Sequence, residues 1–163
     1  ETVLNESIKD NVSLVRQCMQ KGFVLRDRDS RLYMEKMRKE LLIKMGDELD
    51  PCDSLSGGNQ QKVLLGKWLV MSPNILIIDE PTRGIDISAK SEIYATLNKL
   101  AEQGMAILVV SSEMPEVIGM CDRVLIFRGG SLAGELIHDE LTEQRIAYLA
   151  TTNIKETNKT AIS

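Results

Sequence analysis

The feature that most constrains the fold of this chain is a short apolar run that ends in two carboxylates. Residues 75–78 read Ile-Leu-Ile-Ile and lead directly into Asp79 and Glu80. Such a run is too short for a helix and is typical of a strand that is buried on both faces of a parallel sheet. A second run of this kind, residues 105–110, follows after one amphipathic segment. The two runs therefore predict a strand–helix–strand motif, and with it an α/β fold.

Helical spacing of apolar residues is the dominant pattern elsewhere in the chain. The sequence predicts helices over residues 6–20, 30–45, 56–71, 88–103, 113–120 and 139–150. It also predicts a charged loop over residues 26–30 and a β-hairpin over residues 123–136, around two adjacent glycines. We expect one incomplete domain over residues 1–163. Its parts are a helical subdomain over about residues 1–71, a distal α/β core over about 72–150 and a polar tail over 151–163.

Composition limits the kind of protein that this chain can be. Hydrophobic residues make up 43% and charged residues 27% of the chain, which is a globular balance. The formal net charge is 20 − 24 = −4, and a mildly acidic chain is a poor candidate for a broad nucleic-acid surface. No apolar run approaches the roughly 18 residues that a membrane-spanning helix needs. The three cysteines have neither zinc-ligand nor CxxC spacing, which favours a reducing cytoplasm.

The segment LSGGNQQK, residues 55–62, has the features of a phosphate-binding helix N-terminus. Unpaired N–H groups at such an end point outward, and the helix dipole favours an anion there. Ser56 adds a hydroxyl donor, while Gly57 and Gly58 have no side chains and let a phosphate approach the backbone. Taken alone, these residues also fit an ordinary helix that a serine caps, which is the more frequent case.

Asp79 and Glu80 end the first predicted strand at the edge where α/β proteins place their ligands. Asp79 is suited to holding Mg²⁺, directly or through water. Glu80 is suited to orienting and polarising an attacking water. The alternative is a pair of acids at a solvated strand end, because a single motif is only a hypothesis.

Together these motifs resemble those of the ATP-binding-cassette (ABC) ATPases, and the resemblance covers almost the whole chain. Residues 55–60 resemble the family's signature motif, 75–80 its Walker B strand and 84–86 its D-loop. The resemblance implies an α/β fold that is part of a P-loop NTPase core of the RecA-like, ABC type, with an α-helical subdomain. It also implies ATP and Mg²⁺ as ligands.

The resemblance also implies a role for each motif residue. In that family two cassettes face each other head to tail, and each ATP lies between the Walker motifs of one and the signature of the other. The residues that would bind the γ-phosphate of the partner's ATP are Ser56, Gly57, Gly58 and Asn59. Glu80 would be the catalytic residue and Asp79 the Mg²⁺ ligand at this cassette's own ATP. Asp86 would lie at the shared interface, and Ser112 stands at the family's switch position.

Four segments resemble the second cassette of double-cassette monosaccharide importers of the ribose and galactose type. The segments are residues 7–14, 55–62, 79–86 and 110–117. The resemblance implies an ATP-hydrolysing subunit that is cytoplasmic and peripheral on the inner face of the plasma membrane. Its partners would be a second nucleotide-binding cassette, transmembrane permease subunits and, indirectly, a periplasmic or extracellular sugar-binding protein. Nucleic acid is not expected as a partner.

Three departures from the family pattern bear on these roles. The phosphate-cradling pattern GxxxxGK[ST] is absent, because Gly66 and Lys67 lack its earlier glycine and are followed by Trp68. The chain also begins without Met, so we expect a C-terminal fragment of one cassette, inactive in isolation. Ser112 replaces the switch histidine and cannot carry a charge near neutral pH. Asn59 replaces the usual glutamine and has a shorter reach.

Two other functions stay open from the sequence. One is a soluble ABC-type ATPase module of DNA repair or translation; the acidic charge and the lack of long heptad coiled coils count against it. The other is a non-catalytic interaction module that has kept the fold; the intact Ser56, Asp79 and Glu80 count against it.

Two further expectations concern surfaces. Ile8, Val12 and Met34 are candidates for contact with a permease, although stripes of this kind more often face a core. An incomplete sheet leaves an exposed edge, so we expect the chain to self-associate.

Overall fold

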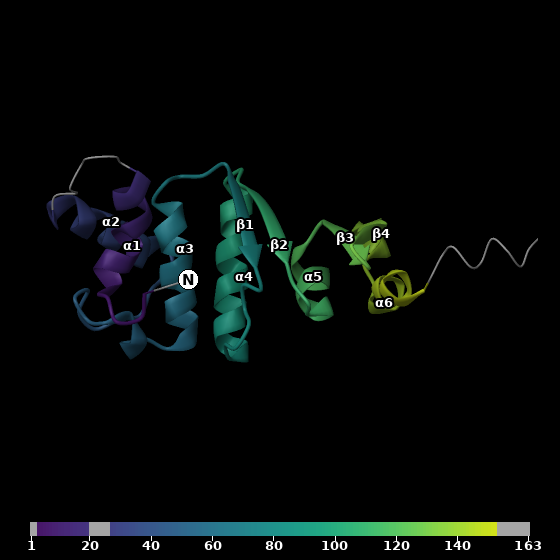
Figure 1. Ribbon diagram of the computed structural model, residues 1–163, viewed down its shortest axis with the longest axis horizontal. Helices are drawn as coiled ribbons and strands as arrows, with labels where there is room; N and C mark the ends of the chain where they lie inside the picture. The colour runs from purple at the N-terminus through teal and green to yellow at the C-terminus, as the bar shows by residue number, and fades with distance from the viewer. Residues whose placement is uncertain (1–2, 20–26, 153–163) are drawn as a thin grey trace, which may run out of the picture. The chain divides into compact units, whose positions relative to one another are not determined.

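The computed structural model describes residues 3–19 and 27–152, and the chain divides into two compact units. The first unit is Glu1–Val110 and the second is Ser111–Ser163, and each is described by itself (Figure 1). The division into a helical subdomain over 1–71, a core over 72–150 and a tail stays a prediction. Tail residues 153–163 lie outside the described residues.

The helical part of the first unit contains α1 (Ile8–Met19), α2 (Asp27–Glu40), a 3₁₀ turn (Cys52–Ser54) and α3 (Gly57–Leu69). Its core is built from aliphatic side chains and methionines. The most deeply buried of these are Ile8, Val12, Met34, Met37, Leu41 and Val63. The first three are fully buried, so their interpretation as core residues is confirmed and the permease contact considered for them is wrong.

Helix α2 differs from the predicted helix at both ends. It begins at Asp27, inside the predicted charged loop, and the acidic Asp29 near this end suits the helix dipole. It ends at Glu40 rather than at residue 45. Leu42 then adopts a positive φ of 52°, and this turn lets the apolar residues on either side of it be buried.

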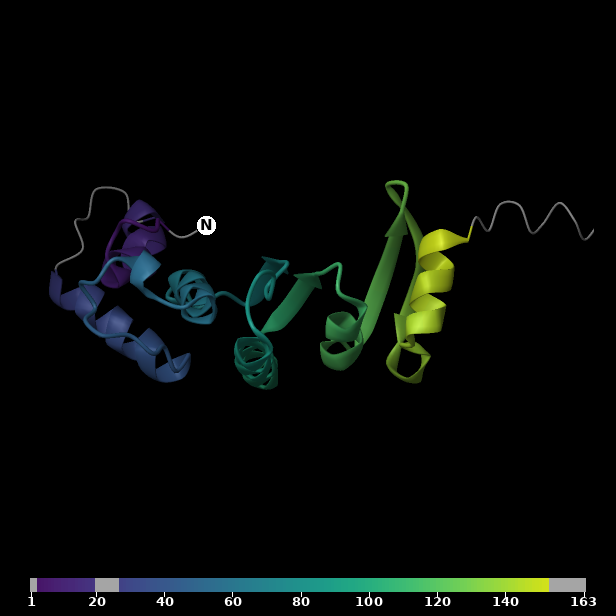
Figure 2. The ribbon, with the colours of Figure 1, turned by 90° about the horizontal axis from the view of Figure 1, so that it is seen from below.

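A parallel strand–helix–strand motif completes the first unit, as predicted. Strand β1 (Ile75–Asp79) pairs with β2 (Ala106–Val110), and α4 (Ile87–Glu102) connects them. The register places Asp79 opposite Val110, so the carboxyl ends of both strands meet at one edge. Figures 1 and 2 show α4 running alongside this two-stranded sheet.

One face of this sheet is buried and the other is exposed, so the predicted burial on both faces is wrong. Along β1 the side chains alternate, with Ile77 70% exposed and Ile78 9% exposed. Helix α4 covers one face with its buried residues Ile93 and Leu97. The other face, here called the exposed sheet face, carries the apolar side chains of Ile75, Ile77, Leu108 and Val110.

The second unit packs two helices against a hairpin. Its elements are α5 (Met114–Met120), β3 (Arg123–Arg128), β4 (Ser131–Ile137), a 3₁₀ turn (His138–Glu140) and α6 (Glu143–Thr151). Strands β3 and β4 form the predicted antiparallel hairpin (Figure 2), and its turn residues Gly129 and Gly130 both have positive φ. The buried core residues are Val117, Ile126, Leu136 and Ile146. The last predicted helix is split, because Thr142 caps α6 by accepting a hydrogen bond from the Arg145 N–H.

None of the described helices combines the length and the apolar character that a membrane crossing requires. The longest described helix, α4, has 16 residues, whereas a span needs about 20 apolar ones.

The exposed sheet face supports the expectation that the chain self-associates. Ile77→Lys places a charge in the middle of that face. In a dimer that covers the face, this removes the burial of one isoleucine side chain, which contributes roughly 1.5–3 kcal/mol to the free energy of association. We expect the dissociation constant of the self-associated state to rise by about tenfold or more, measured by light scattering. Leu49→Lys, at an exposed apolar residue of the helical part, is the matched control. A monomer mass for the wild-type chain at high concentration would contradict the prediction.

Candidate functional site

The N-terminal ends of α3 and α4 meet, and this contact brings two predicted motifs together. Residues 56–59, here called the signature tip, open α3, and Asp86 is the N-cap of α4. A Cβ atom on Gly58 would lie only 2.5 Å from Cβ of Ala89, in the first turn of α4. The signature tip therefore packs against the first turn of α4, which directly follows the segment that resembles a D-loop.

The two glycines of the tip have different surroundings. Gly58 is buried, and the neighbouring Ala89 leaves no room for a side chain there. Gly57 is exposed, and a Cβ atom on it would make an ordinary contact of 3.4 Å with Cγ2 of Ile85. From the sequence, both glycines are expected because they let a phosphate come close to the backbone. The structure adds a packing reason for Gly58, whereas Gly57 keeps the open surface that an anion needs.

Ser56 occupies the N-cap position of α3 without capping the helix through its side chain. Its carbonyl accepts a hydrogen bond from the Gln60 N–H at 2.9 Å, as an N-cap residue should. Its hydroxyl makes no capping hydrogen bond, so the ordinary serine cap considered as the alternative is not formed. The first N–H groups of a helix have no partner within the helix, and this exposed end suits an anion.

Asn59 uses both ends of its side-chain amide within the site. Its Oδ1 accepts a hydrogen bond from the Lys44 N–H at 2.8 Å, and its Nδ2 donates to Oγ of Ser56 at 3.0 Å. Because a backbone N–H can only donate, this contact identifies Oδ1 and leaves Nδ2 facing the hydroxyl. The sequence predicted that the Asn59 side chain reaches less far than a glutamine would. In the structure its amide is directed at the loop after α2 and at Ser56.

Asp79 and Glu80 lie at the carboxyl end of β1. Asp79 is exposed and alternates with the buried Ile78, so its carboxylate belongs to the exposed sheet face. The Glu80 N–H donates to the Val110 carbonyl at 2.8 Å, which extends the sheet by one residue. Glu80 has φ 48°, a left-handed conformation that costs a non-glycine residue about 1 kcal/mol.

Asp86 is held by its own helix. Its carboxylate accepts hydrogen bonds from the Ser88 hydroxyl at 2.6 Å and from the Ala89 N–H at 2.9 Å. These two hydrogen bonds, the Ser88 hydroxyl foremost, hold the pKa of the exposed Asp86 carboxyl below its ordinary value. The same hydrogen bonds fix the start of α4 beside the signature tip.

Ser112 belongs to the second unit and is exposed there. Its neighbour Ser111 donates a hydrogen bond from its hydroxyl to the buried Glu116 and accepts one from the Glu113 N–H at 3.0 Å. These contacts fix the turn into α5. The other predicted site residues, Ser56, Gly57, Gly58, Asn59, Asp79, Glu80 and Asp86, lie in the first unit. Within it the structure joins Ser56 to Asn59 and packs Gly58 against Ala89, close to Asp86, while Asp79 and Glu80 stand at the end of β1.

The donor set at the end of β1 fits a magnesium ion that arrives with a nucleotide. Over residues 3–19 and 27–152, no group of three or more His, Cys, Asp or Glu side chains is placed to hold a metal. Asp79 and Glu80 are two adjacent carboxylates. Mg²⁺ is usually bound by one or two carboxylates together with waters and substrate phosphates, and not by an all-protein cage.

Comparison with known proteins identifies the family. The family model described as "ABC transporter" matches residues 2–83, just over half of the chain. The chain belongs to the ABC transporter family. Solved cassettes have the same fold: an inward-facing putative metal-chelate type ABC transporter (TM-score 0.77, 19% identity) aligns over 91% of this chain and 59% of its own. A nucleotide-free ATP-binding cassette (TM-score 0.72, 18% identity) aligns over 88% of this chain and 60% of its own. The α/β, ABC-type fold expected from the sequence is confirmed.

Curated relatives carry the name of one transport system. The "Ribose import ATP-binding protein RbsA" of Oceanobacillus iheyensis is 46% identical over 151 residues, and that of Bacillus cereus is 47% identical over 150. Each alignment covers 91% of this chain and 30% of the relative. "Ribose import ATP-binding protein RbsA 2" of Rhizobium meliloti is 50% identical over 127 residues, which are 78% of this chain and 25% of that protein. The chain thus spans 25–30% of the length of these relatives.

The structure of this ABC family member also contains an ion-pair cluster that the sequence argument missed. The side chain of Lys62, only 3% exposed, lies 2.6 Å from the carboxylate of Glu92, which is 44% exposed. Lys62 also donates to the Leu42 carbonyl at 3.2 Å, and Lys44 pairs with Glu92 at 3.1 Å. The sequence contains a signal for this cluster, since Lys62 stands among the inward-facing residues of α3. A buried lysine requires a partner.

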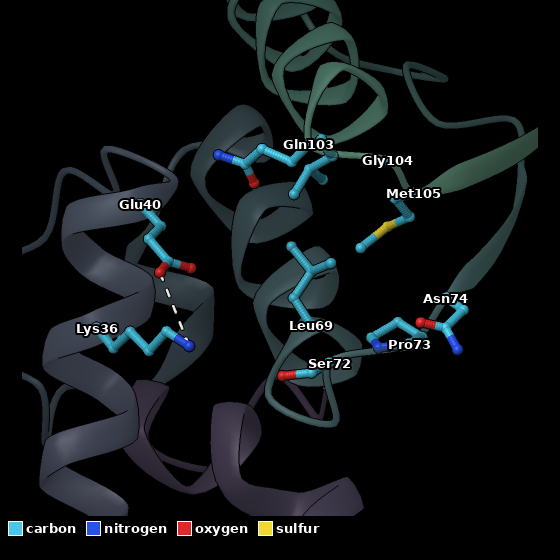
Figure 3. A pocket seen from close by; sticks show the side chains of 10 residues that line it. Lys36, Glu40, Leu69, Ser72, Pro73, Asn74, Gln103, Gly104 and Met105 are labelled. Carbon is cyan, nitrogen blue, oxygen red and sulfur yellow. Dashed lines mark ion pairs between the residues drawn. The ribbon is translucent and has the colours of Figure 1, made fainter.

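A pocket in the described part of the first unit lies away from the predicted site residues. It has a volume of about 260 Å³ and lies at the C-terminal ends of α3 and α4, beside α2 (Figure 3). The ion pair between Lys36 and Glu40, with 3.8 Å between Nζ and Oε1, borders it. The ABC motifs are at the opposite, N-terminal ends of α3 and α4, so this pocket is not the phosphate site.

The close contact at Gly58 predicts a specific loss of stability. Gly58→Ala drives two Cβ atoms together, and overpacking of this kind costs roughly 1–3 kcal/mol, partly offset by the better helix propensity of alanine. Gly57→Ala is the control and should change the free energy of unfolding by no more than about 0.5 kcal/mol. In an Ala89→Gly background, Gly58→Ala should lose its penalty. Urea denaturation measures all four variants, and equal stabilities for Gly57→Ala and Gly58→Ala would contradict the packing argument.

The ion pairs of Glu92 with Lys62 and Lys44 predict that the free energy of unfolding decreases at acid pH. Hydrogen bonds from Lys62 and then Lys44 hold the pKa of the Glu92 carboxyl below its ordinary value. A depressed pKa contributes stability that is present above the unfolded-state pKa, about 4.3, and is lost as the pH falls through the folded-state value. Glu92→Gln should therefore be less stable at neutral pH and should show a shallower decline below about pH 4.3.

Urea midpoints across pH 3–7 test this expectation, with about half a pH unit between points so that the slope of each limb is resolved. Glu102→Gln, an exposed glutamate at the other end of α4, serves as the control and should keep the wild-type slope. An unchanged slope in Glu92→Gln would rule out the contribution of this ion pair.

Proposed function

We propose that this chain is part of the ATP-binding subunit of an ABC importer whose cargo is a monosaccharide. The observation that carries the proposal is the 46–47% identity, over 91% of the chain, to ribose import ATP-binding proteins. The uncapped, exposed signature tip supports a direct part for this chain in ATP binding. The acidic net charge and the family membership both count against a module of DNA repair or translation.

The signature tip would act in trans, on ATP held by a second cassette. The Ser56 hydroxyl and the N–H groups at the start of α3 would donate to the γ-phosphate, and Gly57 would let it approach the backbone. Gly58 would keep the tip close to α4, and Asn59 would support it from the side. Catalysis in such a site consists mostly of positioning and electrostatic stabilisation.

Asp79 and Glu80 would serve the ATP of this cassette itself. Asp79 would hold Mg²⁺, which when bound neutralises charge on the phosphates. Glu80 would orient the attacking water and accept its proton. The 163 residues contain no GxxxxGK[ST] pattern. Asp79 and Glu80 would therefore act on a nucleotide although these 163 residues do not include the loop that holds its phosphates. Ser112 would donate to the γ-phosphate without the charge that a histidine brings.

ATP binding in this proposal drives transport through the partners. Closure of two cassettes on ATP, with Asp86 at their interface, and reopening after hydrolysis would rock transmembrane permease subunits. The chain would lie on the inner face of the plasma membrane through that permease. A periplasmic or extracellular sugar-binding protein would act indirectly by delivering the cargo.

The chain alone should bind ATP weakly and should not hydrolyse it. The reason is that the phosphate cradle is absent from its sequence, while Asp79 and Glu80 supply only carboxylates. Calorimetry with Mg²⁺ and ATP, together with a phosphate-release assay, measures both properties. Micromolar ATP affinity, or turnover that depends on Mg²⁺ and is lost in Glu80→Gln, would overturn this expectation.

The action in trans is tested by ATP-dependent association with a cassette that carries GxxxxGK[ST]. We expect binding in the presence of Mg²⁺ and ATP, and about tenfold or greater loss in Gly57→Asp, because a carboxylate there repels the γ-phosphate. The matched control is Gly119→Asp, where an added side chain meets no neighbour within 4 Å. Equal association of wild type and Gly57→Asp, or no response to ATP, would refute the proposal.

A further inference from the structure

A continuous set of hydrogen bonds joins the surface of α4 to the hydroxyl of Ser56. It runs from Glu92 to Lys44, from Lys44 to Asn59 and from Asn59 to Ser56. We propose that Glu92 and Lys44 are positioning residues, which act through Asn59 to keep the Ser56 hydroxyl available as a donor to a phosphate. This inference rests on the proposed function of the signature tip and assigns residues to it that no motif contains.

The orientation of the hydroxyl follows from what each atom can donate. Nδ2 of Asn59 donates to Oγ of Ser56 at 3.0 Å, so Oγ is the acceptor in this contact. A hydroxyl has one proton to donate and two acceptor lone pairs. Its proton is therefore not used by Asn59, and its Oγ accepts no capping hydrogen bond from the helix. The exposed Ser56 hydroxyl is left with its proton directed away from the amide, as a donor to an anion must be.

Lys44 is what keeps the Asn59 amide in this orientation. A freely rotating asparagine could turn its Oδ1 toward Ser56 and accept the hydroxyl proton itself. The Lys44 N–H, 2.8 Å from Oδ1, opposes that rotation because two donors would then face each other. The backbone position of residue 44 therefore decides which way the amide points, and through it the direction of the hydroxyl.

Glu92 in turn fixes the backbone at residue 44. The loop after α2 is held from two sides: Lys62 donates to the Leu42 carbonyl at 3.2 Å, and Nζ of Lys44 donates to Oε1 of Glu92 at 3.1 Å. The other carboxylate oxygen of Glu92 accepts from Lys62 at 2.6 Å. Between these two anchors Ile43 is buried. One carboxylate thus ties the loop to both α3 and α4.

The first test uses the chain alone and does not depend on any partner. Glu92→Gln keeps the size of the side chain but removes the charge that both lysines pair with. We expect the protection of the Lys44 amide hydrogen from solvent exchange, followed by NMR, to fall by about tenfold, with protection in α1 unchanged. Glu102→Gln should leave it unaltered. Unchanged protection in Glu92→Gln would overturn the proposal, whatever the chain binds.

The second test is a double-mutant cycle in the ATP-dependent association with a cassette that carries GxxxxGK[ST]. Glu92→Gln and Ser56→Ala should each weaken association by about threefold to tenfold, and Glu92→Gln should have no further effect once Ser56 is Ala. A merely structural role of Glu92 would give additive losses, and additivity would overturn the proposal. If Glu92→Gln fails to fold, Lys44→Met, at a side chain 74% exposed, takes its place in both tests.

The two tests separate this inference from the function on which it rests. Loss of protection at Lys44 without any ATP-dependent association of the wild-type chain would refute the proposed function, and the phosphate-directed part of the inference with it. Loss of protection with a non-additive cycle would support both.

Discussion

The arrangement of the site depends on the contact between the N-terminal ends of α3 and α4. Gly58 and Ala89 approach so closely that no side chain fits between them, and the buried Lys62 pairs with Glu92 one turn further along α4. A buried lysine is costly unless it is paired and hydrogen-bonded, so this pair and the glycine contact require the same helix placement. Because of that placement, a tip that opens one helix lies beside a carboxylate that caps the next, although Gly58 and Asp86 are 28 positions apart in the sequence.

The carboxyl end of β1 is built on a different constraint. A parallel sheet brings the ends of β1 and β2 to one edge, and the hydrogen bond from the Glu80 N–H to Val110 extends the pairing beyond Asp79. The positive φ at Glu80 then turns the chain out of the strand. The two acids therefore leave the sheet at a defined place, next to an apolar face that α4 does not cover. This local geometry is the basis of the roles proposed for Asp79 and Glu80.

Much of this could be predicted from the sequence, since it depends on short-range patterns. The strand–helix–strand motif followed from two β-branched runs and an amphipathic segment, and the hairpin followed from Gly129 and Gly130. The motif spacing was enough to identify the ABC family, which the match over residues 2–83 bears out. The start of α2 was missed because its charged residues look like a loop until the helix dipole is considered. The exposed sheet face was missed because apolar content does not tell which faces of a strand are covered.

The sequence by itself determined the fold class and the family, and it predicted which side chains are chemically active, because each of these depends on residue type and spacing along the chain. The tertiary structure alone decided how those side chains are used. It showed that Ser56 leaves its helix uncapped, that Gly58 is small because Ala89 is near, and that Asn59 is turned by Lys44 toward a hydroxyl. The reason is that these properties arise between residues distant in sequence, where hydrogen-bond direction and packing distance are set by neighbours that no local pattern records.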